Sequence, residues 1–430
     1  MTRSLRLGLL ALLMWPGLVQ MAAAQGGSDY IVMFQPGTSA AARAGSAQRA
    51  GAILRSNYAI VAAAAVRVPN ANALQALQRD SSVIQIIPDR RVTAFQGADV
   101  AAKAKPGGGG SGGQVVPEGV KRVGAPTASS NGTGIGVAIV DTGIDFAHRD
   151  LSVAPESFSA FGGSCQDGNG HGTHVAGTVA ALENSVDVVG VAPQAKPYCV
   201  KVLDNSGNGS DITVMDGLDW IGQNAGLVNP PIRVVNMSLG REGTLGDNDA
   251  LRAAVAALYN AGIVVVVSAG NDQSLEVQNN VPATYPEVLA VASTTARTGT
   301  NKCRFLPGGI QADTASYFTT DGAFSGGIGV TVSAPGEDQE NVNAGCLISS
   351  TGILSTRNGG GTTRLSGTSM AAPHVSGVVA RLMQVLGLSG VETIRSWIRS
   401  TANRIGDAPL NSPTSSYTFD GEREGVVKAP

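Results

Sequence analysis

The sequence predicts a doubly wound α/β domain with a mostly parallel sheet, preceded by a small α+β domain. From residue 114 onward, short apolar segments rich in β-branched residues alternate with amphipathic helical segments, which indicates a parallel sheet covered on both faces. Residues 26–96 instead follow the order strand, helix, strand, strand, helix, strand, typical of a ferredoxin-like split βαβ sandwich. The stretch AKAKPGGGGSGG within residues 97–113 has the composition of a flexible linker.

The elements of the small domain follow from apolar patterning. The segments 30–34, 58–68 and 83–87 are apolar enough for strands, and 39–50 and 71–79 have helical patterning. In the large domain, we expect strands at 136–141, 199–203, 234–238, 263–268 and 288–292, and helices at 171–182, 210–223, 247–260, 369–386 and 390–404. Because doubly wound sheets carry their sites at the carboxyl ends of strands, the candidate functional residues are sought there.

Composition excludes some functions and indicates a compartment. The chain has 430 residues, a net charge of -2 and only 14% charged residues, so nothing indicates a surface for nucleic acid. Residues 1–24 carry two arginines, an apolar run and three alanines, which is typical of a secretory signal peptide. An uncleaved anchor is the alternative, but the run falls short of the roughly 20 residues that span a bilayer. We therefore expect a secreted or periplasmic protein with no membrane span in its mature form.

The four cysteines are Cys165, Cys199, Cys303 and Cys346. In an exported chain an even count favours disulfides over reactive thiols. Three pairings are possible, and bonds between neighbours in sequence are slightly favoured.

Histidine chemistry would have to use His148, His171, His174 or His374. His171 and His174 lie in DGNGHGTHVAGT, at the start of a predicted helix. A zinc site of the H-E-x-x-H type would need a glutamate and wider spacing, both missing here. We expect His174 to be a packed helix residue, which leaves His171 at the rim of the sheet.

Asp141 and Ser369 are the other candidates at the rim. Asp141 ends the strand of GVAIVDTGID, where a buried carboxylate needs a partner such as a histidine N–H. The alternative for Asp141 is a turn cap, the role we expect for Asp145. Ser369 lies in LSGTSMAAPHV, where a helix N-terminus would stabilise negative charge. Alone, Ser369 would be a helix cap; the three motifs together favour catalysis.

These motifs resemble those of the subtilisin-like serine proteases, the subtilases of peptidase family S8. The chain order Asp141, His171, Ser369 is the order of that family. The resemblance implies that Ser369 is the nucleophile, His171 the general base and acid, and Asp141 the residue that orients the imidazole. It also places Asn271, in VVVVSAGND, as the amide of the oxyanion hole.

The resemblance further implies two edges that bind an extended polypeptide substrate by β-augmentation. One edge lies in NMSLG and the other in VLDNSGNGS. The residues concerned are Ser238, Leu239 and Gly240 on the first edge, and Ser206, Gly207, Asn208 and Gly209 on the second. Arg241 and Glu242 then depart from the small residue usual in the family, so P1 specificity and the physiological substrate stay open.

A structural Ca²⁺ site is also implied by the resemblance, because oxygen-bearing positions of the family recur at three separated places. A solvated loop and a surface aspartate are the alternative. The implied ligands are Gln114, Asp150, Leu182, Asn184, Val186 and Val188. They would place the mature N-terminus near residue 113 or 114.

The small domain, 26–96, resembles an I9-type subtilase propeptide that acts as an intramolecular chaperone and inhibitor; an independent binding domain is the alternative. Self-cleavage could fall near Phe95–Gln96, in the linker, or at both. The peptidase domain, 114–430, is expected to be monomeric and to need no organic cofactor. The 98 positions from Asn271 to Ser369 exceed those of compact members, and we expect disulfide-stapled surface loops there. The alternatives to a protease of this type are a non-catalytic homologue and a metalloprotease.

Overall fold

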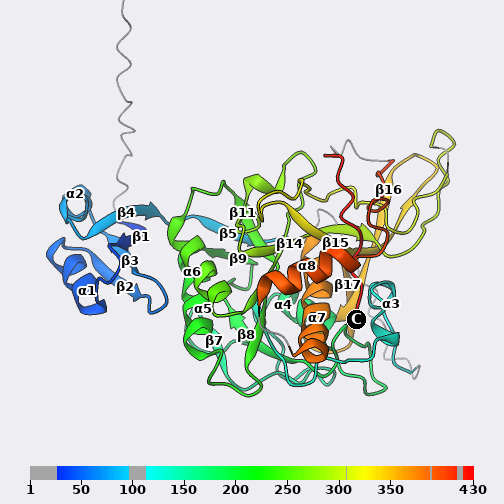
Figure 1. The fold of residues 1–430 in the computed structure, drawn as a ribbon, viewed down its shortest axis with the longest axis horizontal. Helices are drawn as coiled ribbons and strands as arrows, with labels where there is room; N and C mark the ends of the chain where they lie inside the picture. The colour runs from blue at the N-terminus through cyan, green and yellow to red at the C-terminus, as the bar shows by residue number, and fades with distance from the viewer. Residues whose placement is uncertain (1–26, 96–112, 307, 388–389, 414–419) are drawn as a thin grey trace, which may run out of the picture.

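The computed structural model describes residues 27–95, 113–306, 308–387, 390–413 and 420–430. The expected signal peptide, and the expected linker except Gly113, lie outside the described residues. A small N-terminal domain lies against helices α5 (Asp211–Asn224) and α6 (Asp249–Asn260) of the larger domain, as Figure 1 shows.

The N-terminal domain has the predicted order of elements: β1 (Ser28–Phe34), α1 (Ala40–Arg49), β2 (Ile53–Asn57), β3 (Ala63–Val68), α2 (Ala71–Arg79) and β4 (Val83–Pro88). Its strands form an antiparallel sheet in the order β2-β3-β1-β4. The side chains of Ser39 and Asn70 cap α1 and α2 by accepting from backbone N–H groups. Strand β2 lies earlier than expected, because this exposed edge strand contains polar residues and lacks an apolar pattern.

The large domain confirms the predicted fold class. Its central sheet, among the described residues, has the order β17-β16-β15-β14-β12-β10-β6-β8-β7. The strands from β15 to β7 in that order are parallel, whereas β16 and β17 are antiparallel. The bounds are β6 (Gly136–Asp141), β7 (Ser157–Ser159), β8 (Lys196–Lys201), β10 (Ile232–Met237), β12 (Val264–Ser268), β14 (Val288–Thr295), β15 (Val330–Val342), β16 (Ile348–Thr356) and β17 (Thr362–Leu365).

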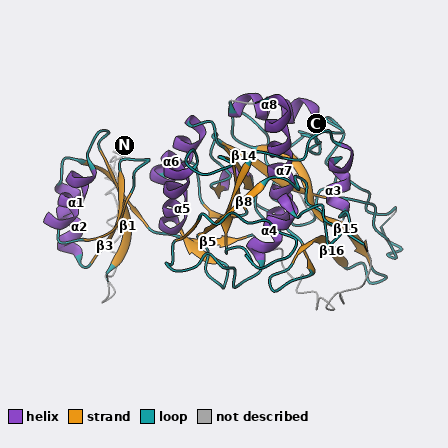
Figure 2. Ribbon diagram, turned by 90° about the horizontal axis from the view of Figure 1, so that it is seen from below, coloured by secondary structure: helices purple, strands orange, loops and turns teal. Residues whose placement is uncertain are grey.

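Helices cover both faces of this sheet, as the view in Figure 2 shows. The apolar side chains of α5 and α6 pack on one face. Those of α4 (His171–Ala180), α7 (Thr368–Leu386) and α8 (Val391–Thr401) pack on the other, where α3 (Glu118–Arg122) also lies. Short 3-10 turns η1 (Ala125–Thr127) and η2 (Val277–Asn279) join these elements. Burial on both faces thus explains why the central strands are mostly apolar.

The segment between Asn271 and Ser369 was expected to form disulfide-stapled surface loops, and this is only partly right: the Cys303–Cys346 bond is present, but the segment also contains three strands of the central sheet that were not predicted. Strands β15, β16 and β17 extend the central sheet. The buried acids Glu337 and Glu340 interrupt the apolar pattern of β15, which hides the strand from sequence reasoning. Burial raises the pKa of both, to about 10 for Glu340, so they are accommodated as neutral carboxyls.

Both disulfides join neighbours in sequence. Cys165 is bonded to Cys199 and Cys303 to Cys346, with Cα separations of 6.2 and 4.9 Å. Such bonds are typical of exported proteins.

A third sheet joins the two domains. It has the order β13-β11-β5-β9, in which β5 (Arg91–Ala94) is the last strand of the N-terminal domain. Its partners β9 (Asn208–Ser210), β11 (Leu239–Glu242) and β13 (Asn280–Val281) belong to the large domain.

No single described helix is long and apolar enough to cross a membrane, although the bent pair α7 and α8 passes on length and composition when taken together.

Candidate active site

The carboxyl ends of the parallel strands bring the predicted site residues to one edge. Asp141 is the last residue of β6, and Asn271 follows the end of β12. His171 is the first residue of α4 and Ser369 the second of α7, so both lie at helix N-termini.

Asp141 and His171 form a buried pair. Asp141 Oδ1 lies 2.8 Å from His171 Nδ1, and neither side chain is exposed. The same oxygen accepts the N–H of Thr142 at 2.7 Å. In the described part of the chain, His171 Nε2 has no hydrogen-bond partner. With Nδ1–H donated to the carboxylate, Nε2 is the basic nitrogen that can accept a proton.

Asp167 organises the turn that presents His171. Its carboxylate accepts the N–H groups of Asn169 and Gly170, each at 2.9 Å, and the Thr173 hydroxyl at 2.6 Å. Gly170 has a φ of 109°, a conformation that glycine tolerates and other residues rarely adopt. Sequence reasoning missed Asp167, although it lies inside the quoted histidine motif.

Ser369 is held through its backbone by Ser238. The Ser238 hydroxyl donates to Ser369 O at 2.8 Å, and Ser369 Oγ donates to Ser238 O at 3.0 Å. The serine hydroxyl therefore points to a carbonyl in this structure and not to His171. Rotation about one side-chain bond redirects it, and such catalytic hydrogen bonds often form fully only with substrate bound.

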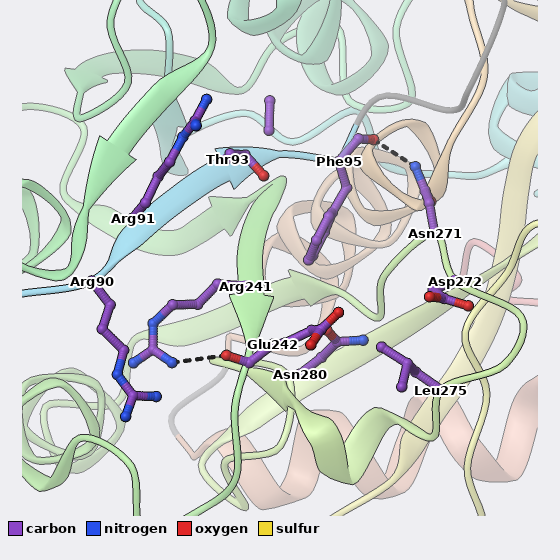
Figure 3. A pocket seen from close by; sticks show the side chains of 11 residues that line it. Arg90, Arg91, Thr93, Phe95, Arg241, Glu242, Asn271, Asp272, Leu275 and Asn280 are labelled. Carbon is purple, nitrogen blue, oxygen red and sulfur yellow. Dashed lines mark hydrogen bonds between the residues drawn. The ribbon is translucent and has the colours of Figure 1, made fainter. Parts of the chain in front are cut away.

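Asn271 points its amide into the cleft (Figure 3). Its Nδ2 donates to the backbone oxygen of Phe95 at 2.9 Å. Its Oδ1 accepts both the N–H and the hydroxyl of Thr368, each at 2.9 Å, so the amide cannot turn over without losing two bonds. Thr368 is therefore a positioning residue that the sequence motif contained but did not single out.

Strand β5 lies in the cleft between the two predicted edges. Its Val92 and Thr93 pair with Gly209 and Asn208 of β9, and its Ala94 pairs with Leu239 of β11. Next to this strand, the Phe95 ring packs on Gly240: a Cβ added there would lie 2.6 Å from the ring.

Two residues that were predicted to lie on the substrate-binding edges do not pair with the strand in the cleft. Ser206 lies in a turn and donates its N–H to Asp204, and Ser238 precedes β11 and supports Ser369. Gly207 does reach the strand in the cleft, because its carbonyl accepts the N–H of Ala94 at 3.0 Å.

His174 and Asp145 have the structural environments expected for them. His174 Nε2 lies 2.9 Å from Ile353 O, and burial lowers the pKa of His174 to about 3, so the ring is neutral. Asp145 accepts the N–H groups of Ala147 and Gly359 at 3.0 and 2.9 Å.

The six predicted calcium ligands converge on one place. Four oxygens surround the Gln114 amide nitrogen: Leu182 O, Asn184 Oδ1, Val186 O and Val188 O, at 2.5, 3.3, 2.9 and 2.7 Å. An amide nitrogen has only two hydrogens to donate to these four acceptors. If the amide is turned over, its oxygen joins the other four around a cation.

Asp150 supplies the negative charge beside this cradle. Its side chain is fully buried, and Oδ2 accepts the N–H of Val188 at 3.0 Å. Within the described ranges, Oδ1 has no partner. Burial raises the pKa of Asp150 to about 7 and outweighs the opposing effects of the Val188 N–H and the charge of Arg149. An all-oxygen set with one carboxylate fits Ca²⁺, which takes 6–8 oxygens.

The fold and this site define a class: serine hydrolases in which a buried Asp–His pair and a helix-borne serine meet at the edge of a parallel α/β sheet. Residues 132–419 match the family model described as "Subtilase family", so the chain belongs to the subtilase family.

The curated relatives of this chain support its place in the subtilase family. The chain is 37% identical over 301 residues to subtilisin DY of Bacillus licheniformis, covering 69% of this chain and 94% of that protein. It is 36% identical over 301 residues to subtilisin Savinase of Lederbergia lenta, covering 69% of this chain and 95% of that one. Subtilisin E of Bacillus subtilis is 34% identical over 306 residues, covering 69% and 68%. The protein is therefore a subtilisin-type serine endopeptidase.

Among solved structures, the crystal structure of fervidolysin from Fervidobacterium pennivorans, a keratinolytic enzyme related to subtilisin, matches with a TM-score of 0.66. It is 23% identical, and the match covers 95% of this chain and 61% of fervidolysin. This likeness supports the fold.

Proposed function

We propose that Ser369, His171 and Asp141 hydrolyse peptide bonds through an acyl-enzyme. His171 Nε2 takes the proton of Ser369 Oγ as this oxygen forms a bond to the substrate carbonyl carbon. When the C–N bond breaks, His171 returns the proton to the leaving amine. Water then attacks the ester by the same route. Asp141 fixes the imidazole and stabilises its protonated form.

The position of the Phe95 carbonyl is the observation that supports this mechanism. Its oxygen lies 2.9 Å from Asn271 Nδ2, beside the N-terminus of the helix that carries Ser369. A carbonyl oxygen at this place becomes the oxyanion after attack, and Asn271 Nδ2 and the Ser369 N–H would stabilise it.

The same observation supports self-processing at the bond after Phe95. The strand β5 pairs on both sides as a substrate would, and Phe95 ends it at Asn271. The N-terminal domain would then remain in the cleft as an inhibitor after cleavage. We propose that it is the propeptide of an exported enzyme, made with the signal peptide 1–24.

Ca²⁺ is the proposed structural metal. Gln114, Leu182, Asn184, Val186, Val188 and Asp150 would hold it. The ion would tie the start of the mature chain to the loop that follows α4, and would take no part in the reaction.

The test is Ser369→Ala, with Ser400→Ala on the exposed face of α8 as the matched control. Ser369→Ala should abolish hydrolysis of denatured protein and leave the N-terminal domain covalently attached, whereas Ser400→Ala should be processed and active. A serine-directed sulfonyl fluoride should label Ser369. Persistent activity of Ser369→Ala, or an enzyme stopped only by a chelator, would contradict the proposed function.

The cleavage site and the export are tested separately. Mass spectrometry of the product in the medium should find N-terminal fragments that start after residue 24 and end at Phe95. Fragments that end only within residues 97–113 would contradict cleavage after Phe95 but leave the catalytic assignment intact.

A further inference from the structure

The segment that includes β5 begins with two arginines, and acidic side chains of the large domain lie near them. Arg90 and Arg91 begin this segment, and both line the cavity beside the cleft (Figure 3). The large domain contributes the acids Glu242 and Asp272 and one cation, Arg241, to the same cavity. Asp247, in the turn that precedes α6, contacts Arg90 directly.

The contact between Asp247 and Arg90 is short and held from the enzyme side. Asp247 Oδ2 accepts from Arg90 Nη1 at 3.0 Å and from the backbone N–H of Thr244 at 2.9 Å. The side chain of Asp247 is 24% exposed, against 45% for Arg90. The turn therefore holds the Asp247 carboxylate in place, and Arg90 reaches it from the strand in the cleft.

The surroundings of Asp247 leave a net negative charge. Arg241 forms a two-pronged ion pair with Asp211, at 2.9 and 2.7 Å, and lies 3.8 Å from Asp247. Two carboxylates thus share one guanidinium. Burial raises the pKa of Asp247, but the Thr244 N–H, Arg90 and Arg241 outweigh it and hold the pKa below its ordinary value. The group is therefore ionised whenever the protease works near neutral pH.

The neighbouring Arg91 meets a neutral acceptor. Its Nε and Nη2 donate to Asn208 Oδ1 at 3.2 and 2.5 Å, on the opposite edge of the cleft. Asn208 also pairs with Thr93 through β9. A side-chain amide oxygen accepts from a cation but adds no charge, so it selects less strongly than a carboxylate.

We propose that Asp247 is a specificity-determining residue that selects a cationic side chain six positions upstream of the cleaved bond. The count takes Phe95 as the residue before that bond, which makes Arg91 the fifth position and Arg90 the sixth. The inference therefore rests on the proposed function. The preferred substrates are polypeptides with Arg or Lys at the sixth position, and Asn208 adds a weaker preference for a long donor at the fifth.

The test uses the mature enzyme and quenched fluorescent peptides with the sequence Arg-Arg-Val-Thr-Ala-Phe before the cleaved bond. In the comparison peptides, the first arginine is replaced by Ala or Glu. A partly exposed ion pair favours Arg over Ala by about 2–5-fold in kcat/KM. Asp247→Asn should remove this preference, and Asp247→Lys should shift it toward Glu. Asp249→Asn, which removes the same charge from the exposed start of α6, should keep the wild-type preference.

Equal kcat/KM for the Arg, Ala and Glu peptides in the wild-type enzyme would overturn the proposal, as would an Arg preference that survives in Asp247→Asn. Because the peptide changes need no mutant, the result does not depend on whether a variant folds. Failure of the proposed function is distinct: no peptide would then be cleaved after Phe. Raising the salt concentration should reduce the preference, since the contact is partly exposed.

Discussion

Gly240 leaves room for the Phe95 ring in the cleft. The Phe95 ring occupies the space that a side chain at Gly240 would fill. Its neighbour Arg241 forms an ion pair with Asp211. On the proposed cleavage after Phe95, we expect an aromatic residue to be accepted at this position.

Gly240→Ala is expected to change this preference. A Cβ 2.6 Å from the ring costs roughly 1–3 kcal/mol if it cannot relax, or about 5–150-fold in kcat/KM for peptides with Phe before the bond. The same Cβ would lie 2.8 Å from the backbone oxygen of Val281, a cost that all substrates share, so peptides with Ala there should lose less activity than peptides with Phe. Gly226→Ala, where an added Cβ meets no atom within 4 Å, is the matched control. An unchanged ratio of Phe to Ala peptides would show that the ring of a substrate lies elsewhere.

At this scale, the sequence predicted the residues that lie within the motifs but not those brought to them by folding. Asp141, His171 and Asn271 carry their signal in short quoted stretches. The contact of Arg90 with Asp247 spans 157 positions and forms only when β5 enters the cleft, so no local pattern reports it.

Helix α5 is the element on which the N-terminal domain rests. Asp219 accepts the N–H groups of Ala59 and Ile60 at 2.7 and 3.0 Å, and a Cβ at Gly222 would lie 2.5 Å from Ile60. Asp216, on the same helix, lines a cavity with Ser56 and Tyr58 of the N-terminal domain. Burial raises the pKa of Asp216 to about 6, with Asp219 and Asp89 adding like charge.

This raised pKa predicts that the N-terminal domain binds more weakly at higher pH. The bound state favours the protonated Asp216, so the linked stabilisation is present below the ordinary pKa of about 3.9 and is lost as pH rises through about 6. Between pH 5 and pH 8, inhibition of the mature enzyme by a polypeptide of residues 27–95 should weaken by about tenfold. Asp216→Asn should flatten this profile. A wild-type profile that strengthens over this range would contradict the linkage.

The elements themselves were predicted unevenly, for physical reasons. Five parallel strands, β6, β8, β10, β12 and β14, are mostly apolar and were found within a few residues, whereas the parallel strands β7 and β15, which contain more polar residues, were not. Strands β5, β9, β11 and β13 are two to four residues long. Among the described residues they form one sheet, in which segments far apart in the chain pair across the cleft, so no local sequence pattern predicts them.

The whole large domain is fastened by one proposed ion and two disulfides. The Cys165–Cys199 bond spans 34 positions and ties the segment before His171 to β8. A loop of that size corresponds to about 3–4 kcal/mol in the chain-entropy description. The calcium cradle fastens the start of the same domain, at Gln114, to the loop after α4.

Added Ca²⁺ is expected to raise the thermal midpoint of the Ser369→Ala protein, which cannot digest itself. At a hundredfold excess over the dissociation constant, binding contributes about 2.7 kcal/mol, which corresponds to roughly 5–10 °C. Asp150→Asn should abolish the rise. Asp187→Asn should retain it, because the Asp187 carboxylate pairs with Arg149 at 2.9 Å and is not among the proposed ligands. A midpoint unaffected by chelation and by added Ca²⁺ would remove the ion from the proposal.

If β5 acts as the proposed inhibitor, its placement between β9 and β11 makes inhibition depend on protein concentration. While one chain carries both domains, the strand competes with substrate as a tethered ligand, at an effective concentration on the order of millimolar. Cleavage after Phe95 would cut the tether without removing any contact of the strand. From then on, occupancy of the cleft depends on the concentration of the freed domain. The cleaved enzyme would therefore stay inhibited at high protein concentration and become active on dilution.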